Sequence, residues 1–78
     1  MFYTYVLKSI KDDKLYVGST SDLKTRIKFH DQGRVTATKG RRPLKLIYYE
    51  ACLTKDKAEE RERYFKTGFG RGFLKNRI

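Results

Sequence analysis

Five side chains in this sequence stand out by type and spacing: two tyrosines, an arginine, the single histidine and a glutamate, at Tyr5, Tyr16, Arg26, His30 and Glu62. Hydrolysis of a phosphodiester requires a positioned water, stabilisation of charge on the phosphate and assistance to the leaving oxygen. Groups of these five types can meet all three requirements together.

Each of the five offers a distinct capability. Tyr5 or Tyr16 could relay a proton from water, provided that cationic neighbours lower the phenol pKa from about 10. Arg26 offers a planar fork that suits phosphate oxygens, and His30 can transfer a proton near neutral pH. Glu62 offers the hard oxygen ligand that Mg²⁺ prefers, with water and phosphate filling the remaining positions.

Each also has an ordinary structural interpretation. Tyrosines on strands are usually core or rim residues, and Arg26 on a helix of a basic protein would normally be solvated. His30 could be a packing residue, and Glu62 could simply pair with Lys66. From the residue types alone, the sequence indicates a basic α/β domain that binds nucleic acid, with nuclease activity as one option.

The two tyrosines fall on segments with strand character. Phe2–Ser9 and Leu15–Gly18 are rich in β-branched and aromatic residues, and a polar turn between them predicts a hairpin. Gly18 is expected to end the second strand. Thr20 or Ser21 could then cap a helix, and Asp22 suits the positive end of that helix.

The predicted helix carries the arginine and the histidine. Apolar periodicity at i, i+4 and i+7 forms one stripe made of Leu23, Ile27 and His30. Arg26 lies one turn from His30, so the two side chains should be neighbours. The helix is expected to end near Gly33, the residue type that favours a left-handed C-terminal position.

The middle of the chain, residues 34–45, holds five basic residues, the only proline and no sustained period. We interpret it as a loop, either mobile and solvated or suited to phosphate contacts. The candidate nucleic-acid-binding residues are in this loop and further along the chain: Lys39, Arg41, Arg42, Lys66 and Arg71.

The last third of the chain predicts a strand and two helices. Leu44–Leu53 has apolar residues on both faces, as expected for a strand buried between layers. Thr54 should cap a helix that ends at Gly68 and whose buried stripe comprises Ala58, Glu62 and Phe65. Residues 69–78 are compatible with a short terminal helix, in which Gly70 and Gly72 would each cost about 1 kcal/mol. The expected architecture is therefore an α+β fold of order β-β-α-β-α-α, with a small antiparallel sheet.

Composition sets the broad class. The 78 residues fit a single domain, expected over 1–78, and 19 Lys+Arg against 9 Asp+Glu give a net charge of +10. A positive field of this size favours phosphate backbones as partners. The sequence has no basic amphipathic helix of the kind that binds a membrane surface. The single cysteine, Cys52, excludes an internal disulfide, and the N-terminal segment is too short and polar for a signal peptide. We expect a cytoplasmic protein.

The spacing of the motifs resembles that of GIY-YIG nucleases, in particular small single-domain members related to the catalytic domain of the bacterial excision-repair nuclease. Tyr3-Thr4-Tyr5 stands where the family has Gly-Ile-Tyr, and Tyr16-Val17-Gly18 stands where it has Tyr-Ile-Gly, with ten residues between them. Arg26 and His30 keep the family's spacing, and the likeness resumes from Ala58 to Lys66. Asn76 resembles the family's polar residue near the end of the domain.

The resemblance implies a metal-dependent phosphodiesterase that acts on nucleic acid, and it favours DNA over RNA while leaving the choice between them open. It implies one Mg²⁺ or Mn²⁺ held by Glu62, a motif tyrosine that helps to activate water, and Arg26 at the phosphate. It also implies proton transfer by His30 and a phosphate-placing role for Asn76.

Tyr3 departs from the family's first glycine, and no DNA-reading domain is appended in this sequence. Any specificity would then come from a protein partner or from DNA shape. Two alternatives stay open: a non-catalytic nucleic-acid-binding module with the same fold, and a purely structural partner protein.

Overall fold

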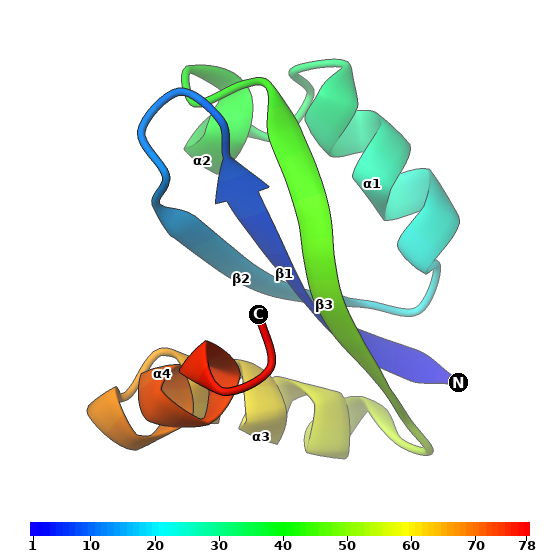
Figure 1. Ribbon diagram of the computed structural model, residues 1–78. Helices are drawn as coiled ribbons and strands as arrows, with labels where there is room; N and C mark the ends of the chain where they lie inside the picture. The colour runs from blue at the N-terminus through cyan, green and yellow to red at the C-terminus, as the bar shows by residue number, and fades with distance from the viewer.

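The computed structural model describes residues 1–78 and has three strands and four helices (Figure 1). In chain order these are β1 (Phe2–Ser9), β2 (Leu15–Thr20), α1 (Leu23–Asp31), α2 (Thr36–Lys39), β3 (Leu44–Cys52), α3 (Lys55–Phe65) and α4 (Gly68–Lys75). The sheet is antiparallel in the order β2-β1-β3, with helices on both faces, so the predicted α+β class is confirmed. No helix is both long and apolar enough to cross a membrane.

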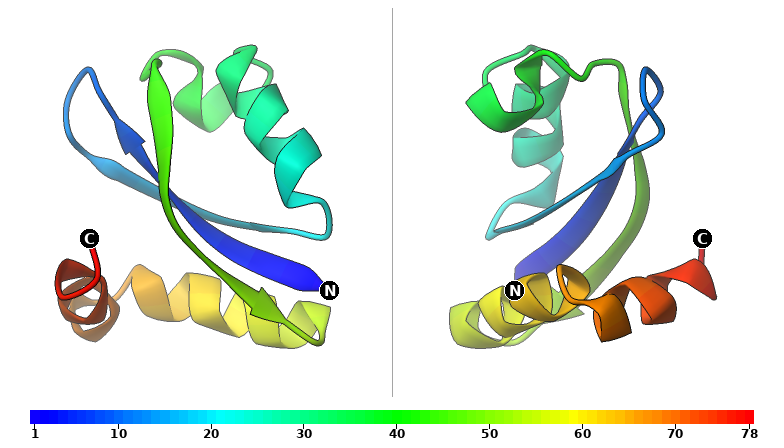
Figure 2. Two further views of the ribbon diagram at one scale, coloured as in Figure 1. Left: turned by 45° about the vertical axis from the view of Figure 1, so that its right-hand side comes forward. Right: turned by 90° about the vertical axis from the view of Figure 1, so that its left-hand side faces the viewer.

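The two faces of the sheet are covered by different helices (Figure 2). Helices α1 and α2 lie on one face, and α3 and α4 lie on the other. Alternation along β1 directs Tyr5 toward α1, where it meets His30, and directs Thr4 toward α3, where its hydroxyl donates to the Ala58 carbonyl at 2.6 Å. The apolar core lies on the α3 and α4 face and consists of Val6, Val17, Phe65 and Leu74.

Gly18 has a different role from the one that the sequence suggests. It does not end β2, which continues to Thr20, but pairs with Tyr5 across the ladder. A Cβ atom on Gly18 would lie 2.5 Å from the Tyr5 hydroxyl oxygen and 2.6 Å from its ring carbon Cζ. The glycine is therefore needed because the Tyr5 ring lies directly over it.

The N-cap of helix α1 lies one residue after Ser21 and two residues after Thr20, the two proposed caps. It is Asp22, not Thr20 or Ser21, and the Asp22 carboxylate accepts from the backbone N–H of Thr25 at 3.1 Å. The expected end is confirmed, because Gly33 follows the helix with φ of 72°.

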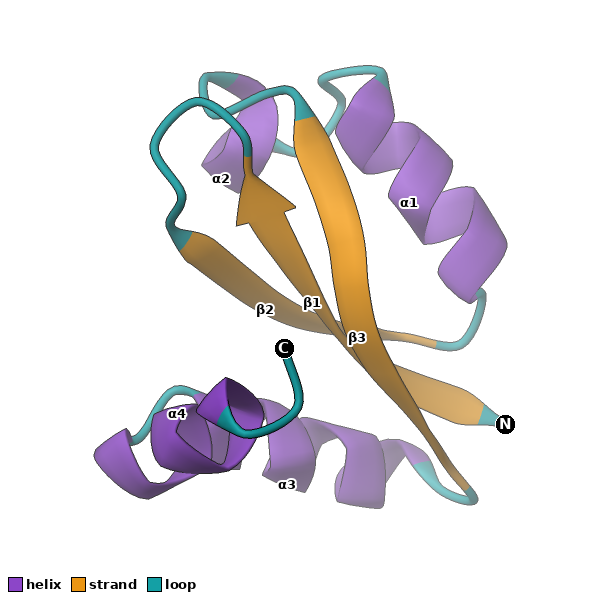
Figure 3. Cartoon of the chain, viewed as in Figure 1, coloured by secondary structure: helices purple, strands orange, loops and turns teal.

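The segment interpreted as a loop contains a helical turn, α2, between α1 and β3 (Figure 3). The sequence does not predict this turn, because four residues are too few to show a helical period of apolar residues. The turn matters because it buries the Thr38 side chain completely.

Two further expectations need correction. Helix α3 begins after Thr54 as predicted but ends at Phe65, and Gly68 opens α4, whose N-cap is Thr67. The third strand is an edge strand rather than one buried between layers, and its Tyr49 is 54% exposed. The two glycines of α4 also differ: Gly70 lies against the Tyr64 carbonyl, where a Cβ would collide, whereas Gly72 faces open space.

Candidate active site

One half of the candidate site is a buried hydrogen-bonded chain between β1, α1 and α2. The Tyr5 hydroxyl lies 2.8 Å from Nε2 of His30, and Nδ1 of His30 lies 2.7 Å from the Thr38 hydroxyl oxygen. Tyr5 is 1% exposed, and His30 and Thr38 are fully buried. Both ring nitrogens of the single histidine are therefore satisfied within the protein.

Tyr16 joins this half from β2. Its ring meets the His30 ring edge to face at 5.2 Å between centroids and lies 6.4 Å from the Tyr5 ring. Unlike Tyr5, it is only partly buried. The structure thus brings both motif tyrosines to His30, but it leaves Tyr16 as the one with access to solvent.

Arg26 is the cation of this half-site. Burial raises the pKa of Tyr5, and the nearby Arg26 guanidinium opposes that rise. Burial lowers the pKa of His30, and the positive charge of Arg26 lowers it further. His30 is therefore a neutral imidazole near pH 7.

The other half of the site comes from the opposite face of the sheet. The Ser19 hydroxyl donates to Oε1 of Glu62 at 2.7 Å, and the Lys66 ammonium contacts Oε2 at 3.0 Å. The Glu62 side chain is 25% exposed, so its carboxylate can be reached from solvent. The pairing with Lys66 that the sequence suggested is present, and it occupies one of the two oxygens.

The two halves meet along β2, the edge strand beside β1. Tyr16 and Gly18 face α1, and the intervening alternation places Ser19 on the α3 side beside Glu62. The Glu62 carboxylate is close enough to Tyr5 to contribute to the rise of the phenol pKa. A substrate at this edge could therefore contact groups from both faces.

The donor set fits a hard divalent cation. The Glu62 carboxylate and the Ser19 hydroxyl offer oxygen ligands, and Lys66 is a flexible side chain, 55% exposed, that can be displaced from Oε2. No group of three or more His, Cys, Asp and Glu side chains forms a dedicated cage. Water and phosphate oxygens would have to complete the coordination, as is usual for Mg²⁺.

Three of the five proposed nucleic-acid-binding residues gather near Tyr16. Arg41, Lys66 and Arg71 line a groove of about 820 Å³ together with Tyr16, Lys14 and two acidic residues, Asp12 and Asp13. Lys39 and Arg42 line a different depression with Asp31, and Arg42 donates to the backbone carbonyls of residues 31 and 39.

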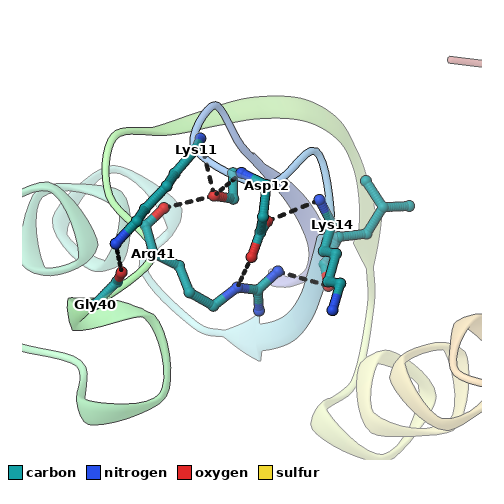
Figure 4. A network of polar contacts seen from close by, with 7 residues as sticks. Lys11, Asp12, Lys14, Gly40 and Arg41 are labelled. Carbon is teal, nitrogen blue, oxygen red and sulfur yellow. Dashed lines mark hydrogen bonds and ion pairs between the residues drawn. The ribbon is translucent and has the colours of Figure 1, made fainter.

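Arg41 also holds the hairpin turn against the segment that follows α2 (Figure 4). Its guanidinium lies 3.6 Å from the Asp12 carboxylate and donates to the Leu15 carbonyl at 3.4 Å. The Lys11 ammonium donates to the Gly40 carbonyl at 3.3 Å. The Arg41 side chain is thus fixed by two contacts, whereas the Lys66 side chain has one, the ion pair with Glu62.

Asn76 lies at the C-terminal end of helix α4. It is the exposed C-cap of α4, and its backbone N–H donates to the Leu74 carbonyl. Its polar side chain has no hydrogen bond to any of the five candidate groups.

Two residues of the site were missed from the sequence, Ser19 and Thr38. Ser19 follows Tyr16-Val17-Gly18 directly, so strand alternation from Val17 could have placed it on the Glu62 side. Thr38 had no such signal, because its position depends on how the segment after α1 folds back.

Comparison with known proteins places these observations in a family. The model of the GIY-YIG catalytic domain matches residues 1–76. A UPF0213 protein of Clostridium perfringens is 46% identical over 67 residues, which are 85% of this chain and 71% of the relative. The UPF0213 protein YazA of Bacillus subtilis is 45% identical over 65 residues, covering 82% of this chain and 65% of the relative.

A solved structure agrees with the fold. The solution NMR structure of a UPF0213 protein from Bacillus halodurans superposes with a TM-score of 0.58 at 32% identity. The match covers 97% of this chain and 84% of that one. The matched segment thus spans about two thirds of the two curated relatives and most of the solved chain.

Proposed function

Because this chain belongs to the GIY-YIG catalytic domain family, we propose that it is a metal-dependent endonuclease that hydrolyses phosphodiester bonds in DNA. The observation that carries the proposal is the convergence of Tyr16, Tyr5 and His30 on one side of the β2 edge with Glu62 on the other. Binding alone would require only the lysines and arginines.

Within this proposal, Tyr16 is the phenol that contacts the attacking water. Tyr5 is almost fully buried, and its hydroxyl is already bonded to His30, whereas Tyr16 is half-buried and lines the basic groove. Tyr5 and His30 then act behind Tyr16, by fixing the rings and by offering a route for a proton.

Arg26 is the proposed phosphate ligand on this side. Its planar fork suits two phosphate oxygens. Arg26 also opposes the rise of the Tyr5 pKa, so its charge lies near the outer end of the buried hydrogen-bonded chain.

Glu62 is the proposed ligand of one Mg²⁺ or Mn²⁺. When bound, the cation would neutralise charge on the phosphate. In the structure the Ser19 hydroxyl orients Oε1, and Lys66 balances the negative charge of the carboxylate. Lys66 also lines the groove, where its ammonium suits the phosphate backbone.

The substrate would be recognised by its structure rather than by its sequence. The groove offers Lys14, Arg41, Lys66 and Arg71, which are suited to phosphates, and phosphate contacts position a nucleic acid without reading bases. A protein partner could supply further targeting.

The first test is cleavage of supercoiled plasmid and labelled branched oligonucleotides with Mg²⁺ or Mn²⁺. Glu62→Gln should lower the cleavage rate at least about a hundredfold, as is typical when one group that stabilises transition-state charge is removed. The affinity for DNA should change little. The matched control is Glu60→Gln, because Glu60 is exposed on the same helix and pairs with Lys57.

A chelator should abolish cleavage by the parent protein. Cleavage by Glu62→Gln at the parental rate would contradict the proposal that Glu62 is the metal ligand. Tight, salt-sensitive binding with no cleavage of any substrate would favour the second candidate, a non-catalytic binding module, for which the net charge of +10 is sufficient.

A further inference from the structure

Thr38 forms the inner end of the buried chain and has a second hydrogen bond. Its hydroxyl oxygen lies 2.7 Å from Nδ1 of His30 and 3.5 Å from the Val35 carbonyl oxygen, to which the hydroxyl donates. No buried side-chain nitrogen or oxygen in the protein lacks a partner. The chain can therefore be followed atom by atom, because each hydrogen bond needs one donor and one acceptor.

The contact with Val35 determines which atom donates and which accepts along the hydrogen-bonded chain. A carbonyl can only accept, so the single Thr38 proton is committed to it, and the Thr38 oxygen must accept from Nδ1–H of His30. A neutral imidazole carries one N–H, so Nε2 is bare and accepts the proton of the Tyr5 hydroxyl.

The charge of Arg26 agrees with this assignment of donors and acceptors. The positive charge of Arg26 lies near the Tyr5 oxygen and favours the orientation in which the Tyr5 proton points away from it, toward His30. The buried position of His30 beside Arg26 keeps the ring neutral, as the argument requires.

We propose that Thr38 is a positioning residue that holds His30 in the Nδ1–H tautomer, so that Nε2 is ready to receive the proton of Tyr5. The step is a proton transfer in which the O–H bond of Tyr5 breaks, an N–H bond forms at Nε2, and the imidazole becomes an imidazolium. The positive charge of Arg26 would stabilise the resulting phenolate and offset part of the cost that burial places on it.

The tautomer follows from the hydrogen bonds and from the neutrality of the buried ring, whereas its role in catalysis rests on the proposed function. This role explains why the short helix α2 is present. Thr38 lies eight residues after His30 in sequence, and the helical turn brings its hydroxyl back to the His30 ring.

Nitrogen NMR tests the tautomer directly, because His30 is the only histidine in the chain. At about pH 8 the ring is neutral, and the ¹⁵N shifts of its two nitrogens distinguish a protonated from a bare position. The parent protein should show a protonated Nδ1 and a bare Nε2. A protonated Nε2 in the parent protein would overturn the proposal without any variant.

Thr38→Val keeps the shape of the side chain and removes the hydroxyl. It should shift the ring toward the Nε2–H form and lower kcat about two- to tenfold with little change in KM, in keeping with the loss of one hydrogen bond. Thr38→Ser should restore both the tautomer and kcat. Thr36→Val is the matched control, because Thr36 is exposed on the same short helix.

The outcomes separate the two proposals. If the parent cuts no DNA, the proposed function fails, but the NMR result still decides the tautomer. If Thr38→Val retains a protonated Nδ1 and the parental kcat, Thr38 has no positioning role.

Discussion

On the face of the sheet covered by α1 and α2, the central buried side chains form a hydrogen-bonded chain, whereas on the face covered by α3 and α4 they form an apolar and aromatic cluster. The first face holds Tyr5, His30 and Thr38. The second face has at its centre Val6, Val17, Phe65 and Leu74, flanked by Tyr48, Tyr64 and Phe73. The central side chains of both faces are almost inaccessible to solvent, so burial alone does not distinguish the two faces.

The comparison separates stability from chemistry. Apolar burial stabilises a fold in proportion to the area removed from water, and aromatic pairs add to it. Buried polar groups contribute little net stability, but they fix one arrangement because any unpaired group is costly. We therefore expect changes on the α3 and α4 face to alter the free energy of unfolding most, and changes on the α1 and α2 face to alter cleavage most.

The largest expected effect on stability is that of Phe65→Ala. The ring is 1% exposed and contacts three other aromatic rings, so its loss should lower the free energy of unfolding by about 3–5 kcal/mol. Denaturant titration measures this change. Phe69→Ala is the matched control, because Phe69 is 87% exposed, and it should stay within about 0.5 kcal/mol of the parent.

A total stability of only about 4–12 kcal/mol is expected for 78 residues, so Phe65→Leu provides a milder variant if Phe65→Ala does not fold. Equal stability of the Phe65 and Phe69 alanine variants would contradict the placement of the main core on this face.

The second effect concerns the face that carries the chemistry. Gly18→Ala forces the Tyr5 ring to move, since the added Cβ would lie 2.5 Å from its oxygen, and it should cost about 1–3 kcal/mol. Cleavage should fall further than stability does, because the ring leaves His30. Gly40→Ala is the control, as nothing lies within 4 Å of its Cβ position. Parental cleavage by a folded Gly18→Ala protein would separate Tyr5 from the mechanism.

A smaller effect should appear in α4, with opposite signs at its two glycines. Gly72→Ala should raise the free energy of unfolding by about 1 kcal/mol, because alanine favours the helix and no atom obstructs it. Gly70→Ala should lower it, because α4 lies directly against the Tyr64 carbonyl. Thermal unfolding of the two variants compares them directly, and a gain in both would show that the close approach is dispensable.

The smallest effect is the pH dependence contributed by His30. Its folded pKa is lowered by burial and then by Arg26, so below about pH 6.5 the unfolded chain binds the proton more readily. Stability should therefore fall as the pH drops from about 7 to 5, with a slope of at most about 1.4 kcal/mol per pH unit. His30→Gln should flatten this slope.

Glu50 contributes to the pH dependence of stability in a separate, lower pH range. The Arg61 guanidinium holds the pKa of Glu50 below its usual value, so that contribution is lost only below about pH 4.5. A slope between pH 7 and 5 that is the same in the parent and in His30→Gln would show that His30 is not protected from protonation.

Local pattern was enough to predict most of the fold. The β-hairpin, α1 with its end at Gly33 and the Thr54 cap of α3 all follow from residue preferences over a few neighbouring positions. The errors lie where a local rule was overridden. Gly18 indicated a strand end but instead makes room for Tyr5, and Gly68 indicated a helix end but opens the next helix.

The sequence by itself determined which groups are available and how they are spaced. Period two places Tyr5 on one side of a strand, and a separation of four residues makes Arg26 a neighbour of His30. These relations are set by backbone geometry and need no tertiary information.

Only the tertiary structure decided which groups meet. Contacts such as Tyr5 with His30, His30 with Thr38 and Ser19 with Glu62 join residues of different elements. It also separated the two tyrosines into one buried and one accessible ring. The physical reason is that local periodicity fixes the face on which a side chain lies, whereas burial and hydrogen bonding depend on which other element packs over that face.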